Sequence, residues 1–282
     1  MIGKKLTVRD IIDLKGVGEK IVMLTAYDAS FGRLLDRSGI EIVLVGDSLG
    51  MVALGYESTI SVTMEEMLHH ARAVKHGVER ALLVGDMPFL SYQVDAREAI
   101  INGGRFLKEA GCDAVKLEGG LEVCETVAAM VRAGIPVMGH IGLTPQTAGA
   151  LGGYKVQGKD ARSARRLLAE AKGLEQAGAF AVVLECLPDK LAAAVTASIG
   201  IPTIGIGAGV QCDGQVLVSH DILGMFEKFT PSFVKRYANL APQIAAAVVA
   251  FKSEVKGCQY PDPDHSFVMQ GEVADLLKQD KG

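Results

Sequence analysis

The chain has 282 residues, 49% of them hydrophobic, which is enough for one large domain with a sizeable core. Its net charge of −4 at pH 7 offers no positive field for a nucleic acid or an anionic membrane, so we expect neither as a partner. Its five cysteines are odd in number and form no CxxC pair, which favours reduced thiols in a cytoplasmic protein over a disulfide framework.

The N-terminal residues predict a short amphipathic helix. Thr7, followed three residues later by Asp10, is typical of a helix start, and Gly16 and Gly18 would end the helix. The apolar residues between them fall on one face, so this helix could close the bottom of a barrel. The first residues, MIGKKLTVRD, contain no apolar run of the kind that directs secretion, and we expect no export signal.

Apolar runs recur along the rest of the chain and predict β-strands. Each run is continuous rather than alternating, which is typical of parallel strands that are covered on both faces. The eight predicted strands are Ile21–Asp28, Ile42–Ser48, Ala81–Phe89, Ala114–Gly119, Val137–Leu143, Ala181–Leu187, Thr203–Ala208 and Gln215–Ser219.

Helical patterns separate these strands, and several end at a glycine such as Gly111 or Gly134. Strands that alternate with helices predict a parallel sheet. Eight such units favour closure into a (β/α)8 TIM barrel, a single domain over residues 1–282, with an open doubly wound sheet as the alternative. The predicted helices include Met64–Val78, Ala96–Ala110, Leu121–Ala133, Ala161–Ala177 and Lys190–Ser198.

Two segments fall outside this alternation. The glycine-rich stretch Thr144–Lys159 follows the fifth predicted strand and is long for a loop in a compact domain. We interpret it as a candidate active-site lid, the alternative being a disordered loop. The tail, residues 260–282, contains Pro261 and Pro263 and is predicted to be extended, either in contact with a neighbouring subunit or mobile.

Polar residues gather where the predicted strands end. Catalytic groups of a (β/α)8 barrel lie at the C-terminal rim of the strands, so we expect these side chains to face a common cavity. They are Asp28, Asp47 with Ser48, Asp86, Lys116 with Glu118, His140, Glu185 and, just beyond the last predicted strand, His220.

Three of these acids, Asp47, Asp86 and Glu118, predict a metal site. They offer carboxylate oxygens and no thiolate, which suits Mg²⁺ or a similar hard ion better than zinc or copper. The alternative is a structural network in which the acids pair with Lys116 or with arginines.

Lys116 and Glu118 are two residues apart, so on a strand both point to the same face. Lys116 could hold an anionic substrate, most simply a carboxylate, or it could pair with Glu118. Glu185 follows apolar residues, and such surroundings can raise the proton affinity of a carboxyl group toward that of a useful base. A buried glutamate with satisfied hydrogen bonds is the alternative. His140 could act directly or orient other groups at the rim.

The chain also carries long motifs in a fixed order: LTAYDASFGRLLDRSGIEIVLVGDSLGMVALGY, VGDMPF, AVKLEGG, VMGHIGLTPQ, VLECLP and TIGIGAGVQCDGQVLVSHDILG. Together they resemble the ketopantoate hydroxymethyltransferase family, from about residue 5 to residue 265. The resemblance implies a barrel of the phosphoenolpyruvate mutase and isocitrate lyase superfamily, and a large homo-oligomer such as a decamer.

The activity that the resemblance implies is transfer of a one-carbon unit from 5,10-methylenetetrahydrofolate to 3-methyl-2-oxobutanoate. The product is 2-dehydropantoate, on the route to pantothenate and coenzyme A, and the reaction passes through an enolate stabilised by Mg²⁺. Two alternatives are a magnesium-dependent lyase or mutase of the same superfamily that acts on a 2-oxo acid, and a non-catalytic barrel that binds an oxo acid.

The matching motifs imply roles for individual residues. Asp47, Asp86 and Glu118 are the implied Mg²⁺ ligands, and Glu185 is the implied proton acceptor. The residues expected to bind the oxo acid are Asp47, Ser48, Asp86, Lys116 and His140.

Overall fold

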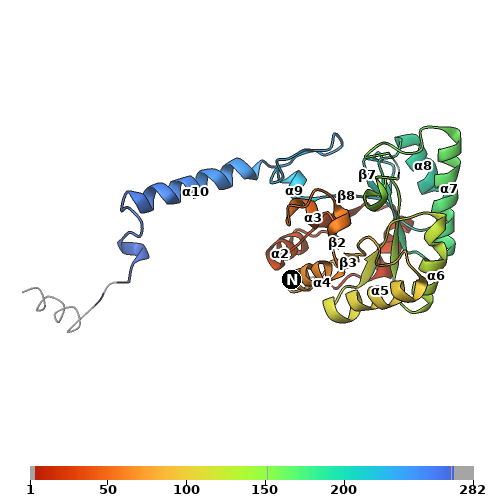
Figure 1. Cartoon of the computed structure of the whole chain (residues 1–282), viewed down its shortest axis with the longest axis horizontal. Helices are drawn as coiled ribbons and strands as arrows, with labels where there is room; N and C mark the ends of the chain where they lie inside the picture. The colour runs from red at the N-terminus through yellow and green to blue at the C-terminus, as the bar shows by residue number, and fades with distance from the viewer. Residues whose placement is uncertain (1–3, 151, 268, 270–282) are drawn as a thin grey trace, which may run out of the picture.

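Parallel strands pair in chain order and close into a barrel, with β1 hydrogen-bonded to both β2 and β8 (Figure 1). The computed structural model describes residues 4–150, 152–267 and 269. It confirms the (β/α)8 barrel and rules out the open sheet. The strands are β1 (Ile21–Thr25), β2 (Ile42–Val45), β3 (Leu82–Asp86), β4 (Ala114–Lys116), β5 (Val137–Gly142), β6 (Ala181–Glu185), β7 (Thr203–Ile206) and β8 (Gly214–Leu217).

The strands end earlier than their apolar runs predict. Strand β2 stops at Val45 although its predicted run extends to Ser48. The reason is that Asp47 leaves the ladder, and its backbone N–H donates to the side chain of Asp86 instead of to a strand carbonyl. At Asp47 the rim is therefore held by a side-chain contact, which a hydrophobic pattern does not report.

The inside of the barrel is filled with apolar side chains and closed at the bottom by helix α1 (Val8–Val17), as predicted. Thr7 caps the start of this helix, and Gly18 ends it with a left-handed φ of 75°. Ile11 is fully buried in the same core as the inward side chains of the strands. The Lys15 ammonium donates to the carbonyl of Ile201, 3.0 Å away and just before β7, which ties the helix to the barrel.

Helices around the barrel bury the outward side chains of the strands in a second core. Helix α5 comes particularly close, because a Cβ at Gly85 of β3 would lie 2.3 Å from the ring of Phe106. The surrounding helices are α2 (Ala29–Arg37), α4 (Met64–Lys75), α5 (Ala96–Ala110), α6 (Cys124–Arg132), α7 (Ala161–Gln176) and α8 (Asp189–Ser198). Shorter helices are α3 (Leu49–Val52), α9 (Ser219–Ile222), η1 (Thr59–Ser61), η2 (Leu121–Val123), η3 (Pro145–Thr147) and η4 (Pro263–His265).

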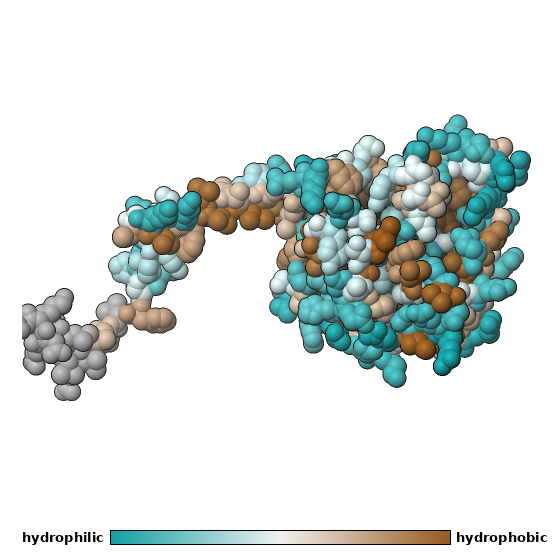
Figure 2. All heavy atoms as spheres, in the orientation of Figure 1, coloured by the Kyte–Doolittle hydropathy of each residue, from teal (hydrophilic) through white to brown (hydrophobic). Residues whose placement is uncertain are grey.

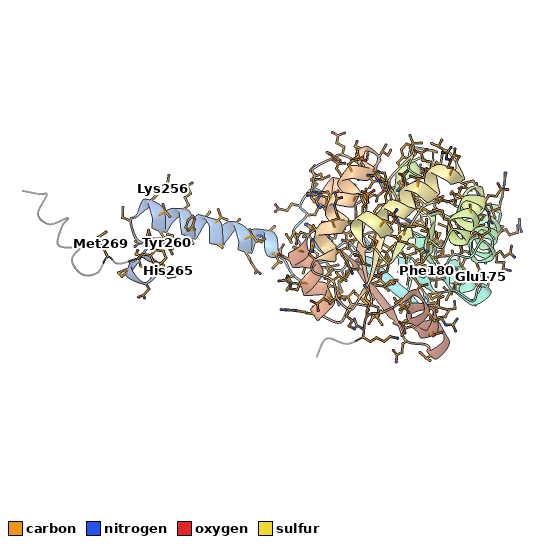
Figure 3. All side chains as sticks on the ribbon, turned by 90° about the horizontal axis from the view of Figure 1, so that it is seen from below. Glu175, Phe180, Lys256, Tyr260, His265 and Met269 are labelled. Atoms are coloured by element: carbon orange, nitrogen blue, oxygen red, sulfur yellow. The ribbon has the colours of Figure 1, made fainter. Side chains whose placement is uncertain are left out.

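Helix α10 (Leu240–Lys256) leaves the barrel and extends away from it (Figures 1 and 3). The structure describes all of its residues, and none of them is buried. Figure 2 shows apolar side chains along this helix. Of the predicted tail, residues 268 and 270–282 lie outside the described residues. The exposed apolar residues of α10 include Ile244, Val248, Val249, Phe251 and Val255.

Two further features concern the cysteines and the helices. Each of the five cysteines, all within the described residues, is a free thiol, so the fold contains no disulfide framework. Among the described helices, none combines the length and the apolar character that a membrane crossing requires.

Candidate active site

A cavity of about 940 Å³ opens at the end of the barrel where the strands finish. Strand ends and the loops that follow them supply its polar lining, while apolar residues such as Leu143, Phe229 and Phe233 supply much of the rest. The structure thus brings together in one cavity every residue for which the sequence predicts a catalytic, metal or substrate role. These are Asp47, Ser48, Asp86, Lys116, Glu118, His140 and Glu185.

The register of two strands places Asp86 beside Lys116. Strands β3 and β4 pair with these two residues opposite each other, and the Lys116 Nζ lies 2.6 Å from Oδ1 of Asp86. Glu118 Oε1 is 3.9 Å from the same nitrogen. Burial lowers the pKa of Lys116, but the neighbouring acids outweigh burial and raise it. The ammonium therefore keeps its charge although its side chain is only 5% exposed.

Asp47 lies next to this pair and adds negative charge. Its backbone N–H donates to Oδ2 of Asp86 over 3.2 Å. Burial, together with the charges of Asp86 and Glu118, raises the pKa of Asp47 well above its ordinary value. Burial also raises the pKa of Asp86, against the attraction of Lys116. Asp47 and Asp86 thus lie beside the same ammonium, and a bound cation would relieve the repulsion between them.

The chemistry of these acids fits a hard divalent cation. Mg²⁺ is usually bound through one or two carboxylates, with water and substrate oxygens completing its octahedron. Within the described part of the chain, no group of three or more His, Cys, Asp or Glu side chains is arranged to hold a metal ion. The role of Glu118 as a third acid at the metal stays a prediction.

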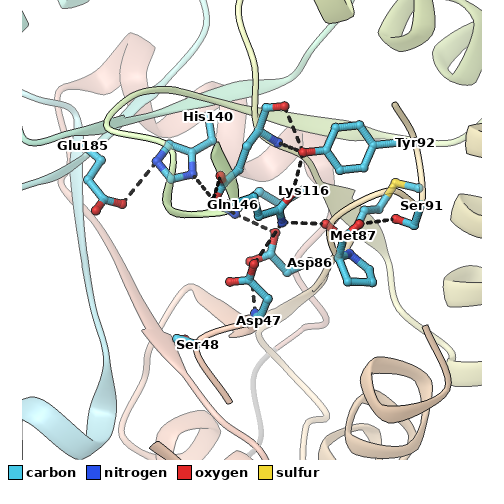
Figure 4. A network of polar contacts seen from close by, with 12 residues as sticks. Asp47, Ser48, Asp86, Met87, Ser91, Tyr92, Lys116, His140, Gln146 and Glu185 are labelled. Atoms are coloured by element: carbon cyan, nitrogen blue, oxygen red, sulfur yellow. Dashed lines mark hydrogen bonds and ion pairs between the residues drawn. The ribbon is translucent and has the colours of Figure 1, made fainter. Parts of the chain in front are cut away.

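His140, in β5, lies between two carboxylates (Figure 4). Its Nδ1 is 3.4 Å from Oε1 of Glu118, and its Nε2 is 3.2 Å from Oε2 of Glu185. Burial and the charge of Lys116 lower the pKa of His140, but the two glutamates outweigh them and raise it to about 9. Burial raises the pKa of Glu118, but the neighbouring side chains of His140 and Lys116 lower it below its ordinary value.

The contact between His140 and Glu185 changes the interpretation of Glu185. The sequence places only apolar residues before it, but the neighbouring strand β5 supplies an imidazole. Glu185 is therefore held by a polar partner while it still lines the cavity. Its role as a base stays a prediction.

Ser48 faces the cavity from the start of α3. Its hydroxyl lies 2.9 Å from the hydroxyl of Tyr27. Burial raises the pKa of Tyr27, so this phenol stays protonated and can donate to Ser48. The pair presents a neutral hydroxyl beside the charged cluster.

Two of the residues that the sequence predicts to face the cavity, Asp28 and His220, make structural contacts instead. Asp28 caps helix α2, because its carboxylate accepts the backbone N–H of Phe31 over 2.8 Å. The ring of His220 stacks on the ring of Phe31, with 5.5 Å between centroids. Both residues follow a strand, yet neither is among the residues that line the cavity.

The sequence did not single out Gln146 or Tyr92, and both are buried beside the acids (Figure 4). The Gln146 amide donates to Asp47, and the Tyr92 hydroxyl contacts the backbone of Glu118. Both lie in loops after strands, whose paths a hydrophobic pattern does not specify. The only signal for Gln146 is its place in the motif VMGHIGLTPQ, and Tyr92 has none.

The predicted lid segment, residues 144–159, forms part of the cavity wall. It begins with the short helix η3, and Pro145, Tyr154, Lys155 and Val156 line the cavity. Residue 151 of this segment lies outside the described residues. Closure over a substrate stays a prediction, to be tested by whether a single proteolytic cut in this loop changes turnover.

Comparison with known proteins shows that the family resemblance of the sequence motifs extends along almost the whole chain. Residues 5–263 match the model of the ketopantoate hydroxymethyltransferase family. A 3-methyl-2-oxobutanoate hydroxymethyltransferase of Desulfotalea psychrophila is 60% identical over 274 residues, covering 97% of this chain and 98% of the relative. The protein of that name from Carboxydothermus hydrogenoformans is 58% identical over 273 residues, covering 97% and 99%.

Solved structures of lower identity share the fold. A phosphoenolpyruvate phosphomutase from Streptomyces platensis superposes with a TM-score of 0.60 at 17% identity, covering 98% of this chain and 96% of the other. Phosphonopyruvate hydrolase in complex with oxalate and Mg²⁺ gives 0.59 at 14% identity, again over 98% and 96%. A 2,3-dimethylmalate lyase, described as a member of the PEP mutase/isocitrate lyase superfamily, gives 0.55 at 15% identity, covering 98% of each chain.

Proposed function

Because this chain belongs to the ketopantoate hydroxymethyltransferase family, we propose that it transfers a hydroxymethyl group from 5,10-methylenetetrahydrofolate to 3-methyl-2-oxobutanoate. Water supplies the hydroxyl oxygen, and the products are 2-dehydropantoate and tetrahydrofolate, on the route to pantothenate and coenzyme A. The observation that carries the proposal is the buried acid cluster around Lys116, with Glu185 on the wall of the same cavity.

Magnesium is the cofactor in this proposal, held by Asp47 and Asp86 with Glu118 as the third acid beside it. The surplus of buried carboxylates over ammonium groups supports a cation at this place. The fold relative phosphonopyruvate hydrolase was solved with Mg²⁺ and oxalate, itself a small dicarboxylate. When bound, the ion would act as a Lewis acid that withdraws electrons from the keto group of the oxo acid.

Lys116 and Ser48 hold the oxo acid. The substrate is a small anion, and the Lys116 ammonium is the cation fixed at the end of β4 by its pairing with Asp86. In a cavity of low dielectric this attraction is stronger than it would be in water. The Ser48 hydroxyl, backed by Tyr27, can donate to an oxygen of the same molecule.

Glu185 acts as the base. Its carboxylate takes the proton from C3 of the oxo acid, which leaves negative charge developing on the keto oxygen, and the Lys116 ammonium stabilises that charge. C3 then forms a bond to the methylene carbon, and the two C–N bonds that join this carbon to the folate break. Water supplies the hydroxyl group, and the two folate nitrogens take up the proton lost from C3 and the proton released by water. His140 orients Glu185 through their 3.2 Å contact, and it is itself held from the other side by Glu118.

An assay of the purified protein tests this function directly. Formation of both tetrahydrofolate and 2-dehydropantoate is expected when Mg²⁺ and the two substrates are present, and neither product is expected when any one of them is omitted. Cleavage of a carbon bond in the oxo acid without folate would instead indicate a lyase. Binding of the oxo acid without any turnover would indicate a non-catalytic barrel.

The same proposal includes a cytoplasmic homo-oligomer. Helix α10 supports self-association, because Ile244, Val248, Phe251 and Val255 share one face of the helix and are exposed. Large exposed apolar surfaces typically mark contacts with other proteins. A decamer remains the expectation for the number of subunits.

A further inference from the structure

Gln146 is the most highly connected polar side chain beside the acid cluster. It lies in η3, directly after Pro145, and is 1% exposed. Its amide nitrogen donates to Oδ2 of Asp47 and to the carbonyl of Met87, each over 2.9 Å. Its amide oxygen accepts from the hydroxyl of Tyr92 over 2.7 Å.

We propose that Gln146 is a positioning residue that sets the orientation of the Asp47 carboxylate for cation binding. This inference rests on the proposed function, because it assigns Asp47 to the metal. It adds a residue of this chain that the family resemblance did not assign.

The contacts of Gln146 determine which way its amide faces. The carbonyl of Met87 can only accept a hydrogen bond, so the group that faces it must be the NH₂. One hydrogen of this NH₂ goes to Met87 and leaves the other for Asp47. The amide oxygen of Gln146 accepts a hydrogen bond from the hydroxyl of Tyr92, which favours the same orientation of the amide. Asp47 therefore always meets a donor, never the amide oxygen.

The backbone of Gln146 orients a second acid. Its N–H donates to Oε2 of Glu118 over 3.0 Å, and Tyr92 accepts the backbone N–H of Glu118 over 3.1 Å. Residues that follow β2, β4 and β5 are thus joined through one buried glutamine. Carboxylates that repel one another need such donors to keep a fixed arrangement. Donors of this kind, one shell away from a metal, hold the ligands in place for it.

The test is the affinity for Mn²⁺ alone, measured by electron paramagnetic resonance as a probe of the Mg²⁺ site. Gln146→Met keeps the length of the side chain and removes its donors, so Mn²⁺ should bind about 10- to 100-fold more weakly. Thr147→Ala is the matched control in the same short helix, since Thr147 is exposed and its hydroxyl pairs with Thr144, away from the acids. Its Mn²⁺ affinity should equal that of the wild type.

Thermal unfolding of each variant separates positioning from simple destabilisation. A folded Gln146→Met protein that binds Mn²⁺ as tightly as the wild type would overturn the proposal. If the methionine variant does not fold, Gln146→Ala removes the same donors without filling the space, and the same two outcomes apply to it. Absence of Mn²⁺ binding by the wild type would count against the proposed metal site itself.

Discussion

Asp86 and Lys116 face each other across the β3–β4 ladder, with 2.6 Å between carboxylate oxygen and ammonium nitrogen. Both side chains are nearly inaccessible to water, so neither can replace its partner by hydration. The pairing fixes the position of the ammonium that we propose binds the oxo acid. Loss of either partner would leave an uncompensated charge inside the barrel.

Replacement of Lys116 by methionine should therefore destabilise the protein strongly. Leaving Asp86 buried without its cation is expected to cost about 3–5 kcal/mol. Lys5→Met is the matched control, because Lys5 also pairs with an aspartate at 2.6 Å, but with 32% of its side chain exposed. That change should cost about 0–1 kcal/mol. Urea unfolding at neutral pH, with a chelator present, measures the free energy of unfolding of both variants. Equal losses of stability would contradict the larger cost that we expect from burial of the Lys116–Asp86 pair.

Asp86→Asn should weaken the binding of both Mg²⁺ and the oxo acid. The amide cannot replace the negative charge that attracts the ion, and it releases the Lys116 ammonium. Asp213→Asn serves as the control, since Asp213 also pairs with a lysine, at 3.0 Å, but at the bottom of the barrel. Isothermal titration calorimetry should show weaker binding of Mg²⁺ and of the oxo acid by Asp86→Asn, and unchanged binding by Asp213→Asn. Unchanged binding of both ligands to Asp86→Asn would exclude the shared site.

Glu185→Gln should stop exchange of the C3 proton of the oxo acid with deuterated water. A glutamine cannot accept this proton, and loss of a positioned base is expected to slow exchange by about 10²- to 10⁴-fold. Mg²⁺ should still bind, because Asp47 and Asp86 are unchanged. Glu170→Gln is a suitable control, since Glu170 is a buried glutamate that pairs with Arg166 on α7. Proton NMR follows the exchange, and a normal rate in Glu185→Gln would rule out this base.

Val248→Glu should reduce self-association. Val248 belongs to the exposed apolar face of α10, and a charge there would be buried in a contact between subunits. Ser253→Glu places the same charge on the opposite face of the helix and should leave assembly unchanged. Light scattering during gel filtration gives the mass of each variant. A monomeric wild type, or equal masses for all three proteins, would argue against α10 as the contact.

The sequence predicts the barrel well because its strands are buried on both faces. Continuous apolar runs mark such strands, and all eight appear where the runs lie. The helix Ala96–Ala110 has the same bounds in the structure, because Asp95 caps its start and Gly111 ends it. Helix α10 was not among the predicted helices, although its apolar residues Ile244, Val248, Phe251 and Val255 repeat at helical spacing.

The sequence predicts several of the strand-end residues that line the cavity, but not their contacts. Asp47, Asp86 and Glu185 stand where strands end, and the fold gathers those ends into one cavity. The 3.2 Å approach of His140 to Glu185 depends on strand register, which no local pattern gives. Gln146 reaches the acids from a loop, and only the three-dimensional path of that loop reveals it.

Helix α1 closes the bottom of the barrel with apolar side chains, so both substrates must enter through the cavity at the opposite end. The acids and Lys116 are buried at the strand ends, so a bulky folate bound at the mouth of the cavity would obstruct the path of the smaller oxo acid. We therefore expect compulsory ordering, in which the oxo acid enters first and its hydroxymethylated product departs last. Product-inhibition kinetics would reveal this binding order. Random binding of the two substrates would mean that the bound folate does not block the entry of the oxo acid.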